Sequence, residues 1–270
     1  MIIHSDLQYA NTAARPLLLN LYLPAVPVPG GQGFPVVVWV SGGGWQRGDR
    51  REPHGPFLTD RGYALASIDY RTSAEAIWPA QIHDCRAAVR WLRDHAGEYG
   101  LDANRIGAWG PSAGGHLVAM LAVTGHVSRL QGEQSHGDQS SAIAAACDWC
   151  GPTDLTRLHD PGWRVPRTQK LHEVVEALLG GSPEQRPIQA RDASPLLHVN
   201  PTCPPIFIMH GLADDIVTPE HSKVFHDALI RQGVDSTLCL LKDLKHSLYS
   251  AERADITRLF FDRTLKSHER

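Results

Sequence analysis

Ser112 is the central residue of a Gly-Pro-Ser-Ala-Gly segment, which fits the pattern G-x-S-x-G. The preceding run Arg105–Trp109 is typical of a short strand, and Ala113–Val123, rich in small residues, is typical of a helix. A sharp turn between the two requires Gly110 and Gly114, because a Cβ at either position would clash with the crowded backbone. The turn lifts the serine Oγ above the sheet edge and directs the helix N-terminus at developing negative charge. Ser112 is therefore the candidate nucleophile.

A serine hydroxyl is a weak nucleophile, so this chemistry needs a histidine base and an acid that orients the base. The chain order of nucleophile, acid and histidine selects the late histidines. His221 and His226 fall inside an expected helix, whereas His246 follows the last expected strand, in a loop that can reach over the sheet edge. We therefore expect His246 to be the base.

The acid is expected after the buried run Pro205–Met209, because active sites of open α/β sheets gather at the carboxyl ends of the strands. Asp214 and Asp215 both follow this run, and either carboxylate could accept a hydrogen bond from the imidazole. Position alone does not separate them. We interpret His210, which comes directly after the strand, as a turn-stabilising residue rather than a catalytic one.

A tetrahedral oxyanion needs backbone N–H donors, and a glycine run after the strand Phe34–Val40 can bring them close. We expect Gly43, Gly44 and the N–H of Ala113, the residue after the nucleophile, to form the oxyanion hole.

The composition excludes several other functions. The 270 residues are 42% hydrophobic and 20% charged, with a formal net charge of −3, so no overall field would attract nucleic acid or an anionic membrane surface. No apolar run approaches the roughly 20 residues of a membrane span, so we expect that the protein is not integral to a membrane. No metal or organic cofactor is expected.

The segment Met1–Asp6 has neither a basic region nor an apolar region of a secretory signal. The expected location is therefore cytoplasmic if Met1 is the native start, and secreted or periplasmic if a signal peptide has been removed. Five cysteines, an odd number, argue against a disulfide framework. The pair Cys147-x-x-Cys150 is interpreted as structural, because residues three apart on a strand point to opposite faces.

Strand-like and helix-like runs alternate along the chain, which predicts one α/β domain over residues 1–270, with a mostly parallel sheet and helices on both faces. Strands are expected at Leu17–Leu23, Phe34–Val40, Tyr63–Asp69, Arg105–Trp109, Ala142–Cys150, Pro205–Met209 and Thr237–Leu241. Helices are expected from Pro79 to about 97–100, at Ala113–Val123, Leu171–Leu179, 219–232 and Ala251–Ser267. The polar stretch Gly125–Ser141 is expected to be a loop, and residues 153–200 a lid-like insertion over the sheet.

Four segments together resemble the α/β-hydrolase superfamily: Ser41–Trp45, Asp69–Arg71, Gly110–His116 and His210–Asp214. The similarity covers nearly the whole chain. The helix at 78–92 and the short insertion resemble esterases close to the hormone-sensitive-lipase and kynurenine-formamidase groups, in particular bifunctional carbohydrate acetyl and feruloyl esterases. The resemblance implies the α/β-hydrolase fold and a serine carboxylesterase that cleaves acetyl or feruloyl esters of carbohydrates through an acyl-enzyme. It implies a small-molecule or oligosaccharide ester as the partner. It assigns the acid to Asp214 and the base to His246.

Two departures from the family pattern leave alternatives open. Ser41 stands where the family usually has the histidine of His-Gly-Gly-Gly, and Lys245 stands where close relatives often have glycine before the catalytic histidine. A cation there would lower the pKa of the base.

One alternative is an arylformamidase or peptidase that uses the same triad on an amide. Another is an inactive hydrolase-fold binding protein, which Ser41 favours and the complete triad disfavours.

Further residues near the expected site have both functional and structural interpretations. Trp45 would supply a backbone N–H donor, form a wall for the acyl group or pack over the loop. Trp149, Trp163 and Tyr249 would stack on a sugar or an aromatic acyl group, or pack under the lid. The charged run Arg47–Glu52 is interpreted as a solvated turn rather than a ligand clamp.

Overall fold

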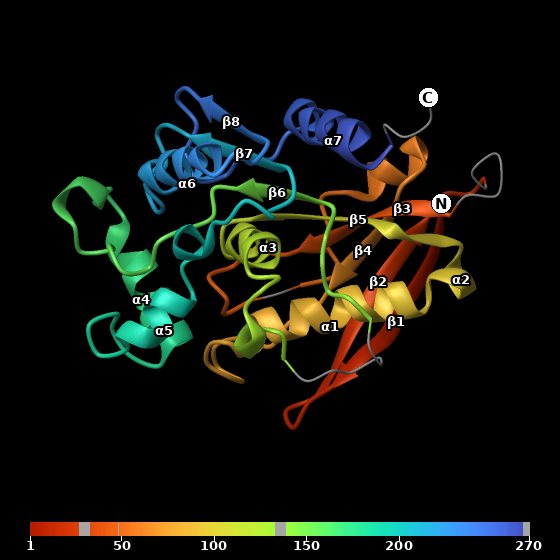
Figure 1. Cartoon of the computed structure of the whole chain (residues 1–270), viewed down its shortest axis with the longest axis horizontal. Helices are drawn as coiled ribbons and strands as arrows, with labels where there is room; N and C mark the ends of the chain where they lie inside the picture. The colour runs from red at the N-terminus through yellow and green to blue at the C-terminus, as the bar shows by residue number, and fades with distance from the viewer. Residues whose placement is uncertain (27–32, 48, 133–138, 267–270) are drawn as a thin grey trace.

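The computed structural model describes residues 1–26, 33–47, 49–132 and 139–266. Within these residues, eight strands form one sheet in the order β1-β2-β4-β3-β5-β6-β7-β8 (Figure 1). The pairs β1–β2 and β2–β4 are antiparallel, and all other neighbours are parallel. The strands are β1 Ile2–Asn11, β2 Pro16–Leu23, β3 Phe34–Val40, β4 Ala64–Ile68, β5 Leu101–Pro111, β6 Ala145–Trp149, β7 Ile206–Gly211 and β8 Ser236–Leu241.

Helices cover both faces of the sheet. They are α1 Ala80–Asp94, α2 Ala96–Tyr99, α3 Ala113–Val123, α4 Thr168–Leu179, α5 Pro187–Asp192, α6 Glu220–Arg231 and α7 Ala251–Leu265. Short 3₁₀ turns lie at η2 Pro56–Arg61, η3 Ser128–Leu130, η4 Pro161–Trp163 and η5 Pro195–His198. Apolar residues of α1, α3, α4 and α6 share one hydrophobic core, and those of α7 belong to a second core on the opposite face (Figure 1).

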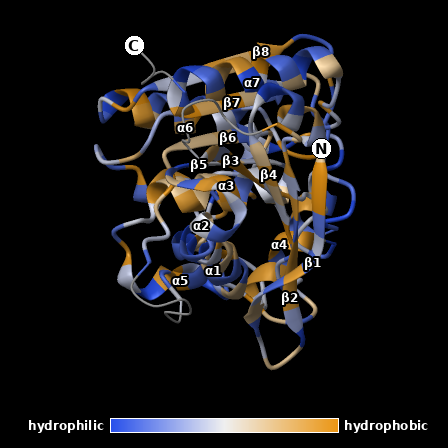
Figure 2. Ribbon diagram, turned by 90° about the vertical axis from the view of Figure 1, so that its right-hand side faces the viewer, coloured by the Kyte–Doolittle hydropathy of each residue, from blue (hydrophilic) through white to orange (hydrophobic). Residues whose placement is uncertain are grey.

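The middle strand β3 shows why these residues form a buried sheet. Val36, Val38 and Val40 belong to the core under α1 and α3, whereas Val37 and Trp39 belong to the core under α7. Every one of these side chains is at most 2% exposed. Parallel strands buried on both faces are continuously apolar, and Figure 2 shows hydrophobic residues along the central strands. The predicted mostly parallel sheet with helices on both faces is therefore confirmed.

The bounds of β3 and α3 coincide with the sequence predictions. The other predicted strands and helices are present with ends shifted by up to four residues, and the predicted helix from Pro79 is divided into α1 and α2. The predicted loop Gly125–Ser141 contains the turn η3, and its residues 133–138 lie outside the described part, as does Ser267 at the predicted end of the last helix. The insertion 153–200 is described in full, and none of its residues is in a strand. The helix α5 there was not predicted.

Strand β1 was also missed, and its position at the sheet edge explains why. Ile2 and Ile3 are each about half exposed, and Tyr9 is the one fully buried residue of the strand as described. Two register irregularities further break the alternation of buried and exposed positions. An edge strand of this kind lacks the two-residue periodicity by which strands are recognised.

The cysteines Cys85, Cys147, Cys150, Cys203 and Cys239 are all free. The argument that Cys147 and Cys150 point to opposite faces was wrong, because both belong to the core under α7. Cys150 lies beyond the end of β6 with φ 48°, where the alternation of a strand no longer applies. Over the residues that the structure describes, no helix is long and apolar enough to span a membrane.

Candidate active site

Ser112 occupies a strained turn between β5 and α3. Its backbone has φ 55° and ψ −121°, a conformation that residues other than glycine rarely adopt. A Cβ on Gly110 would lie 2.5 Å from the carbonyl oxygen of Val40, and one on Gly114 would lie 2.0 Å from the same oxygen. Both glycines are therefore required for the turn, as predicted.

Ser112, His246 and Asp214 form a continuous chain of hydrogen bonds. The Ser112 hydroxyl donates to Nε2 of His246 over 2.8 Å, and Nδ1 of His246 donates to Oδ2 of Asp214 over 2.7 Å. A carboxylate can only accept, so Nδ1 carries the proton and Nε2 is free to accept one from the serine. Each side chain comes from a different element: the turn before α3, the loop after β8 and the loop after β7.

Asp214 is held as an anion by its surroundings. Its Oδ1 accepts hydrogen bonds from the N–H groups of Ile216 (2.9 Å) and Val217 (3.0 Å). Burial raises the pKa of the Asp214 carboxyl, but the hydrogen bonds from His210 and His246 outweigh burial and hold this pKa well below its usual range. The neighbouring Asp215 faces other partners, with its Oδ2 3.8 Å from both Arg167 and Lys245. The structure thus places Asp214, and not Asp215, against the imidazole.

His210 is fully buried and lies within β7, not directly after the strand as expected. Its Nε2 donates to the carbonyl of Val217 (3.0 Å) and to Oδ2 of Asp214 (3.1 Å), and its Nδ1 accepts from Ser222 (2.7 Å). These bonds agree with the interpretation of a turn-stabilising residue. The contact with Asp214 was not predicted, although the spacing of four residues between the two side chains was visible in the sequence.

The glycine loop after β3 was predicted to supply the oxyanion donors. Gly43 has φ 115° and Gly44 has φ 64°, which glycine tolerates better than other residues. Among the described residues, none accepts a hydrogen bond from the N–H of Gly43 or Gly44. Both glycines line the same cavity as Ser112 and Ala113, the first residue of α3. The geometry therefore leaves these donors available to a ligand.

Two contacts fix this loop from behind. The hydroxyl of Tyr70 donates to the carbonyl oxygen of Ser41 over 3.0 Å. The indole N–H of Trp45 donates to Nδ1 of His116 (3.2 Å), and Nε2 of His116 donates to the carbonyl of Ala193 (2.7 Å). Trp45 is 1% exposed, so its side chain packs beneath the loop. The Ser41 hydroxyl is buried and has no hydrogen-bond partner among the described residues.

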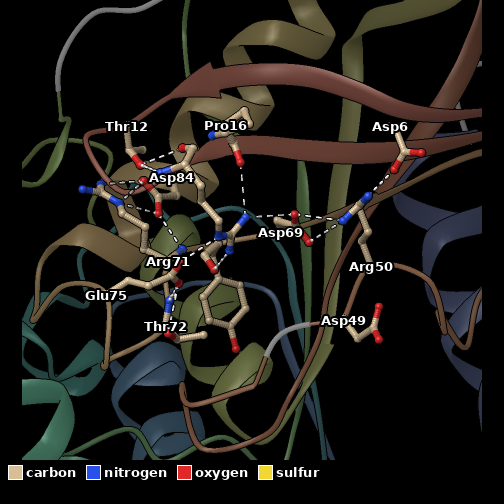
Figure 3. Close-up of polar contacts among 12 residues, drawn as sticks. Asp6, Thr12, Pro16, Asp49, Arg50, Asp69, Arg71, Thr72, Glu75 and Asp84 are labelled. Carbon is tan, nitrogen blue, oxygen red and sulfur yellow. Dashed lines mark hydrogen bonds and ion pairs between the residues drawn. The ribbon is translucent and has the colours of Figure 1, made fainter.

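An ion-pair network anchors the segment that follows the loop (Figure 3). Arg50 donates to both carboxylate oxygens of Asp69 (3.2 and 3.0 Å) and also pairs with Asp6 of β1. Arg15 reaches Asp69 from the other side over 3.1 Å. The side chain of Arg50 is 14% exposed, so the interpretation of the whole run Arg47–Glu52 as a solvated turn was wrong at this residue.

The catalytic side chains open into a cavity of about 680 Å³. Its apolar lining includes Trp39, Trp45, Trp149, Leu171, Val174, Ile216, Leu248 and Tyr249. Trp149 is buried and donates its indole N–H to Thr257, whereas Tyr249 is 46% exposed at the cavity and lies edge-on to the ring of His54. Trp163 does not line the cavity; it is buried against His221 and Arg157.

Comparison with known proteins identifies the family of this chain. The BD-FAE family matches residues 19–229, which include the glycine loop, Ser112 and Asp214. The chain belongs to the BD-FAE family. Probable carboxylic ester hydrolase LipM of Mycobacterium tuberculosis is 32% identical over 203 residues, which are 72% of this chain and 44% of LipM. The chain spans about half the length of the curated relatives it matches.

Solved structures resemble this BD-FAE chain over nearly its whole length. A truncated form of a carbohydrate esterase from gut microbiota superposes with a TM-score of 0.86 and 25% identity, covering 98% of this chain and 97% of that one. Esterase Est2 of the Planctomycetes species Thermogutta terrifontis, with butyrate bound, has a TM-score of 0.77 and 27% identity, covering 96% and 93%. The chain therefore has the α/β-hydrolase fold.

One group of potential metal ligands lies at this site. Cys150, Asp214 and His246 place ligand atoms within 4.8 Å of one another. Asp214 and His246 are hydrogen-bonded to each other, and the Cys150 thiol donates to the backbone carbonyl of His246 (3.7 Å). Burial raises the pKa of the Cys150 thiol far above its usual value, which disfavours the thiolate that a metal requires.

Proposed function

We propose that this protein is a serine carboxylesterase that cleaves short-chain or aromatic acyl esters through an acyl-enzyme intermediate. The observation that carries the proposal is the hydrogen-bonded chain from Ser112 through His246 to Asp214, at the wall of a cavity. Membership of the BD-FAE family and the similarity to LipM, a probable carboxylic ester hydrolase, support ester chemistry.

In this mechanism Ser112 attacks the ester carbonyl while Nε2 of His246 removes the proton of the serine hydroxyl. The imidazolium then donates this proton to the departing alcohol, which leaves the acyl group on Ser112. Water, activated by the same histidine, releases the acid in the second half of the reaction. Asp214 keeps the proton of neutral His246 on Nδ1 and stabilises the imidazolium, a role that requires the anionic carboxylate that its hydrogen bonds maintain.

The oxyanion of each tetrahedral intermediate would be held by the N–H groups of Gly43, Gly44 and Ala113. The first two have no acceptor among the described residues, and the third lies at the positive end of the α3 dipole. Loss of one such donor typically lowers kcat by about 100-fold or more. The donors belong to the backbone, so the replacement of the usual histidine by Ser41 leaves them in place.

We infer further that the acyl group is acetyl or feruloyl and that the alcohol is a carbohydrate. The structural similarity to a carbohydrate esterase from gut microbiota supports a sugar ester, and the butyrate bound to Est2 supports a short acyl chain. The cavity of about 680 Å³ has room for an acyl group together with a sugar ring.

The test is hydrolysis of p-nitrophenyl esters from acetate to octanoate, of methyl ferulate and of acetylated xylan. Wild type is compared with Ser112→Ala, and Ser5→Ala, an exposed serine on β1, is the matched control. We expect Ser112→Ala to lower kcat at least about 1000-fold and to abolish labelling by a fluorophosphonate probe, whereas Ser5→Ala leaves both unchanged.

Other outcomes would contradict the proposal. Turnover of N-formylkynurenine with none of the aryl esters would show an amide hydrolase. Absence of both turnover and fluorophosphonate labelling in the wild type would indicate a binding protein with this fold.

A further inference from the structure

The rim of the catalytic cavity is positively charged. Among the described residues that line the cavity, four carry a permanent positive charge and one a negative charge. The cations are Arg47, Arg167, Lys170 and Lys245, and the anion is Asp215. The rim thus carries a formal charge of +3, on a chain whose formal net charge is −3. The four cations come from three separate segments of the chain, so this excess could not be predicted from the sequence.

The single acid does not neutralise the cations. Asp215 lies 3.8 Å from Arg167 and 3.8 Å from Lys245, so it is shared between two weak ion pairs. Over the described part of the chain, neither Arg47 nor Lys170 has a carboxylate within 4 Å. All four cationic residues are exposed, so their charges are available to a solute that enters the cavity.

The cations lie on segments that carry the catalytic groups or pack against them. Lys245 directly precedes His246, Arg167 directly precedes α4, and Lys170 lies in the first turn of α4. Helix α4 lies against the glycine loop, because a Cβ on Gly44 would be 2.9 Å from Cγ1 of Val174. The charged groups are therefore grouped near the base and the oxyanion donors, not scattered over the surface.

The positions of Lys245 and Arg167 indicate which part of the ester they face. His246 delivers its proton to the departing alcohol, so the alcohol leaves on the side of the imidazole. Lys245 precedes this histidine, and Asp215, the neighbour of Asp214, contacts both cations. A negative group on the alcohol would therefore come close to Lys245 and Arg167. The apolar wall of the cavity, which includes Leu171 and Val174, suits an uncharged acyl group.

We propose that the preferred substrate carries a carboxylate on its alcohol part, as an acetylated oligosaccharide with a uronic acid residue does. This inference rests on the proposed esterase function. The four cations attract such a substrate into the cavity, and one or more of them pairs with its carboxylate near the leaving oxygen. The neutral acyl group occupies the apolar part of the cavity.

The test compares two aryl acetates that differ in one charge, 4-acetoxybenzoate and its uncharged methyl ester. Each kcat/KM is divided by the rate of alkaline hydrolysis of the same compound, which removes the difference in leaving-group reactivity. The quantity measured is the charge preference, the ratio of the normalised value for the anion to that for the neutral ester. We expect a charge preference of about 10 at about 10 mM salt, which falls toward 1 at about 1 M salt, where charges are screened beyond about 3 Å.

Substitutions give opposite expectations for residues of opposite charge. Lys170→Gln should lower the charge preference about threefold, and Lys170→Glu about tenfold. Asp215→Asn removes the rim's acid and should raise the preference. Lys242→Gln is the matched control, because Lys242 is an exposed lysine three residues before Lys245 that does not line the cavity. It should leave the preference unchanged.

The natural class of substrate is tested with acetylated xylo-oligosaccharides that carry or lack a glucuronic acid branch. Faster acetate release from the branched compounds, with the same dependence on salt and on Lys170, is expected. A preference of p-nitrophenyl hydrogen glutarate over p-nitrophenyl butyrate, without one for 4-acetoxybenzoate, would place the carboxylate on the acyl side and overturn the assignment. A charge preference of 1 that no substitution changes, in an enzyme that cleaves the neutral ester, would overturn the inference while the esterase function stands. If wild type cleaves no ester, the esterase function fails, and the inference fails with it.

Discussion

Trp45 and His116 are joined by a buried hydrogen bond of 3.2 Å that connects the glycine loop to α3, the helix that follows the nucleophile. The same imidazole donates to the carbonyl of Ala193, at the end of α5 in the insertion 153–200. One side chain thus links the proposed oxyanion donors, the nucleophile helix and the insertion. His116 must keep Nδ1 unprotonated to accept from the indole, and burial does this by lowering its pKa to about 4.

Removal of the Trp45 donor tests the role of this bond. Trp45→Phe leaves a buried acceptor on His116 without a partner, which costs about 1–3 kcal/mol of unfolding free energy. We expect a lower Tm and a fall in kcat of about tenfold, with a smaller change in KM, because the loop should affect the transition state more than substrate binding.

Trp78→Phe is the matched control for that substitution. The Trp78 ring also lies against His116, at 5.6 Å between centroids, but its buried indole N–H has no partner among the described residues. This substitution removes a similar side-chain volume but breaks no hydrogen bond. Equal falls in kcat for the two variants would show that packing, and not the bond from Trp45, positions the loop.

His116 also makes stability depend on pH in a defined window. Its pKa is about 4 in the folded protein against 6.5 in a free chain, so between these values the unfolded chain binds one more proton. The stabilisation is complete above pH 6.5 and is lost as the pH falls toward 4, a total of about 3 kcal/mol. We expect His116→Gln to show a shallower fall of unfolding free energy over this range, measured by urea denaturation. A slope identical to that of wild type would contradict the pKa.

The sequence was sufficient for the parts of the site that backbone geometry dictates. Gly110 and Gly114 could be assigned because a turn this tight has no space for a Cβ, whatever surrounds it. The choice between Asp214 and Asp215 could not be made from the residues, because it depends on which carboxylate the loop turns toward His246. The family resemblance supplied the assignment to Asp214, and the geometry agrees with it.

Other features depend on contacts between distant segments and left no local signal. The exposed edge strand β1 is held by pairing with β2 and by the ion pair between Asp6 and Arg50, not by a periodic apolar face. The charge of the cavity rim arises only when α4 and the loop before His246 come together. Neither feature follows from the order of residues within one segment.

Ser41 is expected to contribute little through its side chain. Its buried hydroxyl has no partner among the described residues, and the loop is held through its carbonyl oxygen by Tyr70. Ser41→Ala should therefore keep kcat/KM within about twofold and should not lower Tm, since an unpaired buried hydroxyl is itself unfavourable. Tyr70→Phe, which removes the donor to that carbonyl, should lower kcat. A large loss of activity in Ser41→Ala would show that the hydroxyl replaces the usual histidine.

Asp148 is a buried acid beneath the turn that holds Ser112. Its ionised form is unfavourable in this position. Its Oδ1 accepts the N–H of Gly151 over 2.8 Å, but Oδ2 is buried without a partner among the described residues. Burial raises the pKa of Asp148 to about 6, against the opposing effects of the Gly151 N–H and of His210. The raised pKa means that the folded protein binds one more proton than the unfolded chain between pH 3.8 and about 6.

The stabilisation by the proton on Asp148 is therefore complete below pH 3.8 and is lost as the pH rises through 6, a total of about 3 kcal/mol. Asp148→Asn cannot ionise and keeps an oxygen for the Gly151 N–H. At pH 8 we expect the unfolding free energy of the variant, measured by urea denaturation, to exceed that of wild type by up to about 3 kcal/mol. At pH 4 the two unfolding free energies should be equal. The exposed Asp60→Asn is the control, with the same difference from wild type at both values of pH. If Asp148→Asn is less stable at pH 8, the ionised carboxylate has a partner that stabilises it, and the raised pKa is wrong.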